Sequence, residues 1–150
     1  MEELIGKSIK KIEISEELLR FTTTDDMQYS YLAVGDCCSS SYFYDFYGVK
    51  NLLAGNPITA IEEVDLGEEE TSDDSLLQLY GVRLITTAII PKYPNIPPVE
   101  VSAIFSFRNE SNGYYGGYLE KIEDASLYNE TNLVELTDDI QEVLTTVLLP

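Results

Sequence analysis

Residues 8–35 read SIKKIEISEELLRFTTTDDMQYSYLAVG, and this stretch decides the fold that the sequence predicts. Residues 8–14 alternate apolar and polar side chains with one slip, which is typical of a strand with one buried face. Residues 18–24 and 29–35 have the composition of two further short strands, and polar turns precede both of them. Three short strands joined by tight turns predict an antiparallel meander.

The middle of the chain continues this β-rich pattern. Strands are expected at 58–66, 76–90 and 99–108, and the second of these is expected to carry a bulge at Gly81. Residues 91–98, PKYPNIPP, hold four of the six prolines and are incompatible with a central strand. They predict a stiff excursion between two strands.

Helical signals are few and short. The serines that follow Cys38 are placed to cap a short helix at the aromatic cluster YFYDFY. The segment VKNLLAGNP is typical of one helical turn, closed by Gly55 and not continued through Pro57. Asp138 and Gln141 form a plausible capping pair for a C-terminal helix that packs on the sheet or on a partner subunit.

These elements predict an α+β fold, mostly an antiparallel β-sheet meander with short helices and a C-terminal helix. The chain of 150 residues is expected to form a single domain over 1–150, with a core at 4–122 and a helical tail at 131–149. Apolar runs fall short of the roughly 20 residues that a membrane span needs. The N-terminus lacks a signal-peptide core, so a cytosolic location is expected, and the acidic charge described next argues against a membrane partner.

The charge is strongly unbalanced, with 27 acidic and 9 basic residues and a formal net charge of −18. Such a surface repels nucleic acid, so no nucleic-acid partner is expected. Two interpretations remain open: simple solubility, or mimicry of DNA phosphates by clustered carboxylates. Every charged residue from 62 to 74 is acidic, and residues 67–75 of this segment are expected to form a polar loop.

The two cysteines are adjacent, at Cys37 and Cys38, and the chain contains no histidine. Neighbouring cysteines rarely reach disulfide geometry, and two thiols do not complete a tetrahedral zinc site. Both are expected to be reduced and to point to opposite faces of an extended strand, with the inward thiol in the core. Without histidine, the common nucleophile–histidine pairs are excluded, and no catalytic residue, metal or cofactor is predicted.

Two stretches could form a binding site. The first, RNESNGYYGG, begins at Arg108, a planar cation suited to phosphate or carboxylate. Its other candidate ligand-binding residues are polar or aromatic: Asn109, Ser111, Asn112, Tyr114 and Tyr115. The second stretch, GDCCSSSYFYDF, adds Asp36, Cys37 and Ser39. The structural alternatives are an ordinary Asn-Gly hairpin turn in the first and an aromatic plug under the sheet in the second.

The elements LIGKSI, GDCCS and RNESNGYYGG, in this order along residues 4–118, resemble a widespread family of small phage and prophage proteins. The second and third elements are similar to those of Thoeris anti-defence sponge proteins. The resemblance implies a phage counter-defence protein that binds and sequesters a cyclic ADP-ribose-type immune signal without cleaving it. It also implies a homo-oligomer with ligand pockets between subunits. The residues at 91–98 and the tail from about 122 depart from the pattern.

Within this resemblance, Arg108 is the phosphate-binding donor, and Asn112, Tyr114 and Tyr115 are candidates for base or ribose contacts. The expected partner is therefore a small-molecule cyclic nucleotide. The alternative function is an acidic, DNA-mimic-type inhibitor of a host nuclease or another host defence protein. It rests on the acidic charge and on the absence of histidine.

Overall fold

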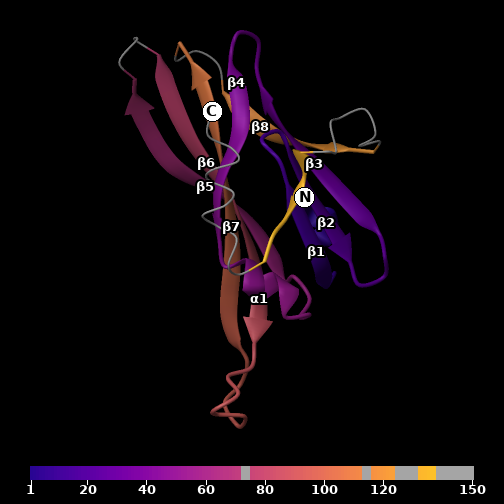
Figure 1. Cartoon of the computed structure of the whole chain (residues 1–150). Coiled ribbons are helices and arrows are strands. Elements are labelled where there is room, and N and C mark those ends of the chain that lie inside the picture. Colours follow the sequence, from indigo (N-terminus) through magenta and orange to yellow (C-terminus); the bar gives the residue numbers. More distant parts are fainter. Residues whose placement is uncertain (72–74, 113–115, 124–131, 138–150) are drawn as a thin grey trace.

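The computed structural model describes residues 1–71, 75–112, 116–123 and 132–137, and within them the chain forms two antiparallel β-sheets (Figure 1). The predicted α+β class is wrong, because strands dominate the described residues and the single meander is replaced by two sheets. The apolar alternation that marks strands runs through most of the chain. The helical signals are too short to bury an amphipathic face of their own.

The first sheet contains the predicted meander and has the strand order β8-β3-β2-β1-β9. Its strands are β1 (Ile9–Ile14), β2 (Leu18–Thr23), β3 (Gln28–Gly35), β8 (Gly117–Ile122) and β9 (Val134–Glu135). Ile12 pairs with Phe21, and Leu19 pairs with Tyr31, so apolar side chains of successive strands lie side by side. The prediction of three consecutive antiparallel strands is confirmed.

The second sheet has the strand order β4-β7-β6-β5. Its strands are β4 (Ser40–Tyr47), β5 (Ala60–Glu70), β6 (Leu76–Ala88) and β7 (Val99–Ser111). The aromatic cluster expected in a capped helix is therefore strand β4, in which Phe43 and Phe46 are buried on either side of a register shift against β7. The pairing irregularity in β5 lies between Asp65 and Gly67, whereas Gly81, where a bulge was expected, pairs regularly.

The acidic segment is more ordered than predicted. Strand β5 extends to Glu70, where Glu68, Glu69 and Glu70 pair with Gln78, Leu77 and Leu76 of β6. An edge strand that carries a row of charges resists pairing with another sheet. The expected loop is wrong as far as Glu70, and residues 72–74 lie outside the described residues.

The proline-rich residues connect β6 to β7 as predicted and project beyond the body of the two sheets (Figure 1). Large apolar side chains at this end of the hairpin are exposed, including Ile89, Tyr93 and Ile96. The prolines remove backbone donors, which explains why the strand pairing stops before them.

The chain changes sheets twice at one corner. It leaves β3 in the first sheet for β4 in the second, and it returns from β7 to β8. The Asn-Gly corner was expected to join two paired strands, but β7 pairs with β4 and β6, whereas β8 pairs with β3. That expectation is wrong, because an Asn-Gly signal does not specify to which sheet the next strand belongs.

The two inner faces share one apolar core. Phe21 of the first sheet meets Phe105 of the second edge to face, with ring centroids 5.5 Å apart at 89°. Phe46 stacks on the same Phe105 at 6.4 Å, and Phe43 meets Phe107 at 6.3 Å. The contact between Phe21 and Phe105 therefore joins the two sheets, and the other two contacts lie within the second sheet.

The tail begins differently from the prediction. A helical tail was expected over 131–149, but Val134–Glu135 forms strand β9 and pairs with Ile14 and Glu13 of β1. Leu136 follows in the core, with 1% of its surface exposed. This pairing gives hydrogen-bond partners to backbone N–H and C=O groups at the edge of β1, and a helix starting at residue 131 would leave those groups unpaired. The capping pair expected at Asp138 and Gln141 lies outside the described residues.

Helix α1 (Val49–Leu53) confirms the predicted helical turn, and its entry depends on Gly48. Gly48 has φ +74°, and a Cβ added there would lie 2.3 Å from the carbonyl oxygen of Ser102. Left-handed backbone and a close approach to a neighbouring strand both favour glycine.

Replacing Gly48 with alanine is therefore expected to lower the free energy of unfolding by about 3 kcal/mol. Urea denaturation measures this loss. Gly55→Ala is the matched control, because Gly55 has φ +94° but open space around it, so only the conformational cost of about 1 kcal/mol applies. Equal losses in the two variants would show that the close approach to Ser102 does not constrain the fold.

Candidate functional site

The two stretches that the sequence singled out meet at the corner between the sheets. Gly35 pairs with Gly117, and the backbone N–H of Asp36 donates to the carbonyl of Gly116 over 3.0 Å. On the other sheet, Ser40 pairs with Glu110 of β7. Segments about 70 residues apart in the sequence therefore lie side by side because both strand crossings use this corner.

Asn109 lies at the centre of this corner and is fully buried. The Ser41 hydroxyl donates to Asn109 Oδ1 over 2.8 Å, and Asn109 Nδ2 donates to Gln78 Oε1 over 3.1 Å. A Cβ on Gly117 would lie 2.4 Å from Ser41 Oγ and 3.0 Å from Asn109 Cβ. The structure thus gives Asn109 a role in joining three strands at the corner.

The other candidate residues divide between buried and exposed positions. Ser111 is buried, whereas Asn112, Asp36 and Cys37 are exposed. Ser39 is half-buried, and its hydroxyl donates to the carbonyl of Asp36 over 2.7 Å. Tyr114 and Tyr115 lie outside the described residues.

The cysteines lie in the turn between β3 and β4, and both are exposed. They were expected on an extended strand with one thiol inward, and this expectation is wrong. Cys38 has φ +69°, so the chain turns and brings the two Sγ atoms 3.2 Å apart. The sequence signal for this turn was Gly35-Asp36, where strand β3 ends before the cysteines.

Arg108 points away from the shared core. Along β7 the odd-numbered side chains from Ala103 to Ser111 are buried, so Arg108 belongs to the opposite, outer face of the second sheet. Its guanidinium carbon lies 3.4 Å from the centroid of the Tyr44 ring. Tyr42 pairs with Arg108 across β4 and β7. We call Tyr42, Tyr44 and Arg108 the arginine–tyrosine platform.

The charge environment of Arg108 differs from that of the other two arginines. Arg20 contacts Glu13 over 3.0 Å, and Arg83 contacts Glu62 over 3.4 Å. Across residues 1–71, 75–112, 116–123 and 132–137, no carboxylate lies within ion-pair distance of Arg108. Among these residues, Arg108 contacts the Tyr44 ring in place of a carboxylate, and its planar donors are suited to an anion.

The pKa of Tyr42 shows which charges act near Arg108. Burial raises the pKa of Tyr42, and Arg108 opposes this rise while the negative charges of Glu110 and Glu16 add to it. Tyr42 therefore stays protonated at neutral pH and keeps a hydroxyl donor at the platform. The nearby carboxylates show that the positive potential is confined to the immediate surroundings of Arg108.

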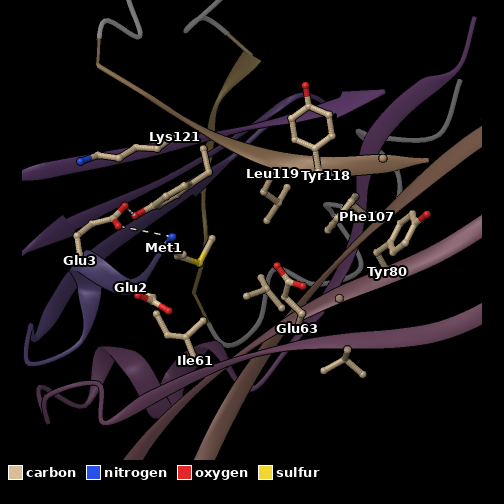
Figure 2. A pocket seen from close by; sticks show the side chains of 15 residues that line it. Met1, Glu2, Glu3, Ile61, Glu63, Tyr80, Phe107, Tyr118, Leu119 and Lys121 are labelled. Carbon is tan, nitrogen blue, oxygen red and sulfur yellow. Dashed lines mark hydrogen bonds and ion pairs between the residues drawn. The ribbon is translucent and has the colours of Figure 1, made fainter. Parts of the chain in front are cut away.

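A separate cavity of about 610 Å³ opens between the sheets (Figure 2). Its size falls in the range of small-molecule pockets. Aromatic residues line it from both sheets: Tyr31, Tyr80, Phe107 and Tyr118. Figure 2 shows Glu2, Glu3 and Glu63 around the same space. Sequence reasoning missed this cavity, because its walls come from segments that are far apart in the chain, from Met1 to Lys121.

The charges in this cavity disfavour an anion. Glu2, Glu3 and Glu63 line it, while Lys121 already contacts Glu123 over 3.6 Å. A phosphate placed there would face carboxylates in a partly desolvated space, which is unfavourable. The cavity and the arginine–tyrosine platform are therefore sites of opposite electrostatic character.

Glu3 and Tyr31 form a hydrogen bond at one end of the cavity, in which the phenol donates to the carboxylate. Burial raises the pKa of Tyr31, and the charge of Glu3 raises it further. For Glu3, burial raises the pKa, but the Tyr31 hydroxyl, the amino group of Met1 and Lys121 together bring it below its ordinary value. The pair is thus most stable as phenol and carboxylate.

This pair predicts a pH dependence at both extremes. The lowered pKa of Glu3 contributes stability that is present above its ordinary value of 4.5 and is lost as acid protonates the folded state. The raised pKa of Tyr31 contributes stability that is lost as the pH rises above its ordinary value of 10.0. Tyr31→Phe should remove both contributions, about 1 to 2 kcal/mol at neutral pH.

Urea denaturation of both proteins from pH 3 to pH 11 measures this effect. The difference in unfolding free energy between the wild type and Tyr31→Phe should be constant near neutrality and should shrink below about pH 4.5 and above about pH 10. Tyr118→Phe is the matched control, because Tyr118 is 47% exposed. A difference that does not change with pH would contradict the assignment.

The described residues contain neither a group of side chains arranged for a metal ion nor a membrane-spanning helix. Within residues 1–71, 75–112, 116–123 and 132–137, no group of three or more His, Cys, Asp or Glu side chains is arranged to hold a metal ion. In the same part of the chain, no helix has the length and apolar character needed to cross a membrane.

Comparisons with known proteins link the chain to a family and to a virus. A family model described as "Domain of unknown function (DUF7448)" matches residues 2–121. An uncharacterized protein of Acanthamoeba polyphaga mimivirus is 30% identical over 124 residues, which cover 77% of this chain and 87% of that protein. No solved structure matches.

Proposed function

This chain belongs to the DUF7448 family, and we propose that it is a counter-defence protein that captures a cyclic nucleotide immune signal. The proposed ligand is of the cyclic ADP-ribose type, and it is sequestered without being cleaved. The site that we assign to it is the arginine–tyrosine platform with the exposed polar residues of the neighbouring corner.

The observation that carries the proposal is the state of Arg108. The chain has 27 acidic and 9 basic residues, yet among the residues that the structure describes no carboxylate lies within ion-pair distance of Arg108. Arg20 and Arg83 follow the expected pattern and contact Glu13 and Glu62. Arg108 instead lies against the ring of Tyr44, and its planar donors suit a phosphate.

The surroundings of Arg108 match the other parts of a nucleotide. The Tyr42 hydroxyl can donate to a phosphate or a ribose oxygen, and aromatic rings offer stacking surfaces for a base. Two residues further along the paired strands from Tyr42 and Arg108, Ser40 pairs with Glu110. The turn that contains Asp36 and Ser39 lies directly before Ser40. Ribose hydroxyls can donate to such carboxylate oxygens while the phosphates face the arginine.

The assignment of a signal and of a viral role draws on the sequence. The paired elements GDCC and RNESNGYYGG resemble those of Thoeris anti-defence sponge proteins, and these elements are neighbours at the corner. The mimivirus relative is compatible with a virus-encoded protein. Capture without cleavage is consistent with a chain that contains no histidine, the commonest general acid–base residue.

A homo-oligomer is part of the proposal. The platform lies on the outer face of a sheet, so the described residues supply only one wall of a pocket. A second copy of the chain would supply the opposite wall and exclude water from the phosphate contacts. Host cytoplasm is the compartment in which such a signal is captured, and this location belongs to the proposal.

The net charge of −18 does not prevent anion binding at short range. The Debye length is about 8 Å at physiological ionic strength, so distant carboxylates are screened. A sequestering protein also depends on slow release more than on fast capture. Slow release comes from buried, specific contacts, and not from long-range attraction.

The test mixes the purified protein with the product of a TIR-domain enzyme and separates the protein by ultrafiltration. The signal should leave the filtrate and return unchanged after the protein is heat-denatured, as measured by mass spectrometry. A filtrate that keeps its signal, or a signal that returns with a different mass, contradicts the proposal. The buffer without protein is the control for adsorption.

A second candidate function is supported by the acidic edge of the second sheet. Strand β5 exposes Glu62, Asp65 and Glu68–Glu70, and these carboxylates lie along an extended backbone at the sheet edge. Regularly spaced negative charges could occupy the DNA groove of a nuclease. In this case Glu68→Gln, Glu69→Gln and Glu70→Gln combined should abolish inhibition, whereas Arg108→Ala should leave it unchanged.

A further inference from the structure

We propose that Cys37 and Cys38 form a vicinal dithiol that is reversibly oxidised to a disulfide between adjacent residues. The two Sγ atoms lie 3.2 Å apart, and both side chains are exposed to solvent. This inference does not rest on the proposed function: the turn borders the site proposed above, but the modification involves only the two thiols and neither Arg108 nor Tyr44.

The backbone of the turn brings the thiols together. Ser39 N donates to the Asp36 carbonyl over 2.9 Å, which closes a four-residue turn with the cysteines at its two central positions. Cys38 has φ +69° whereas Cys37 does not have positive φ, and this combination is that of a type II turn. In an extended strand the same side chains would point to opposite faces.

The choice of residue at the second central position is unusual. Type II turns favour glycine there, because a Cβ in the left-handed region is strained. The chain carries Cys38 instead, although the turn itself would be better formed with glycine. A strained backbone that persists at an exposed position indicates a role for the side chain, and here the role requires the partner thiol next to it.

The reaction is a thiol–disulfide exchange with a small disulfide such as glutathione disulfide. The thiolate of one cysteine attacks a sulfur of the oxidant, forms a mixed disulfide and releases one glutathione thiolate. The neighbouring thiolate then attacks the protein sulfur of that mixed disulfide and releases the second glutathione. The two cysteines lose two protons and two electrons, and the oxidant becomes two molecules of glutathione.

The geometry also sets how easily the bond is reversed. Neighbouring Cα atoms are about 3.8 Å apart, which is shorter than the usual separation across a disulfide. A disulfide formed under this constraint is strained and easily reduced, which is the property of regulatory bonds. The hydrogen bond between the two thiols raises the pKa of Cys37, so oxidation should accelerate as the pH rises.

Treatment of the full-length protein with glutathione disulfide, followed by intact mass spectrometry, tests the proposal. Because the chain contains only 2 cysteines, an intramolecular disulfide can form only between them. The wild type should lose the mass of two hydrogen atoms, should lose both sites for iodoacetamide and should recover them after reduction. Persistent glutathione adducts on the wild type, or only disulfide-linked dimers, would overturn the proposal.

Variants separate the dithiol from the turn. Cys37→Ser and Cys38→Ser should each retain one glutathione, because no second thiol can release it. Cys38→Gly places at the second central position the residue that the turn favours, and this variant should also retain one glutathione. As an independent probe, phenylarsine oxide should bind one molecule per wild-type chain through both sulfurs with release of water. Equal retention of the arsenical by a single-cysteine variant would also overturn the proposal.

Discussion

Arg108→Ala is expected to weaken binding of the cyclic nucleotide about 100-fold, because it removes a bidentate, charge-assisted contact worth about 2 to 3 kcal/mol. The free energy of unfolding should fall by only about 1 kcal/mol, since the lost contact within the fold is the stacking on Tyr44. Isothermal titration calorimetry measures the binding, and urea denaturation measures the stability.

Two further variants make this result specific. Arg108→Lys keeps the charge but loses the planar pair of donors, so an intermediate loss of about tenfold is expected. Arg83→Ala is the matched control, because Arg83 lies on the neighbouring strand of the same sheet and already contacts Glu62. Equal losses of affinity in Arg83→Ala and Arg108→Ala would indicate a general charge effect and would contradict a site at the arginine–tyrosine platform.

Phe105→Ala is expected to lower the free energy of unfolding by about 3 to 5 kcal/mol. Phe105 is fully buried and contacts Phe21 of the opposite sheet as well as Phe46 of its own sheet. Its removal leaves a cavity between the sheets and ends two aromatic contacts. The urea midpoint should shift accordingly, with an unchanged dependence on urea if the variant still unfolds in one step.

The control for this variant is Tyr47→Ala in the neighbouring strand, where the ring is 57% exposed. The expected loss there is about 0.5 kcal/mol, because little apolar surface is uncovered. If Phe105→Ala lost no more than Tyr47→Ala, the two sheets would not be held together by the aromatic contacts between them.

Local patterns predicted the strands well. The alternation in residues 8–35 corresponds to three paired strands, because a buried face requires an apolar side chain at every second position. The prolines at 91–98 marked the end of β6 and the start of β7 for an equally local reason, namely the missing backbone donors. Signals of this kind are contained in a few consecutive residues.

The assignment of strands to sheets was not predictable in this way. Strand β7 belongs to the second sheet, whereas the next strand, β8, belongs to the first, where it pairs with β3. Strand partners are chosen by contacts between residues distant in sequence, such as Phe21 with Phe105. The alternation of apolar residues identifies the buried face of a strand, but it does not specify which other sheet packs against that face. The predicted single meander therefore became two sheets.

The candidate site shows the same division. Sequence identified both stretches that meet at the corner, and it selected Arg108 as the scarce cation within them. The sequence did not show that Arg108 lies on the outer face whereas its neighbour Asn109 lies in the interior. That distinction follows from strand alternation once the register is known. Gly35-Asp36 marked the end of the strand, but it did not predict that Cys37 and Cys38 share a turn, because the positive φ of Cys38 is unusual for a residue other than glycine.

Native mass spectrometry after co-expression with a signal-producing TIR enzyme tests the central claim most directly. The wild-type protein should be recovered as an oligomer that carries the intact mass of the cyclic nucleotide, and this mass should be released unchanged on denaturation. Arg108→Ala, purified in parallel, should form the same oligomer without the ligand. Wild-type protein recovered without a nucleotide while free signal accumulates in the same cells would contradict the account.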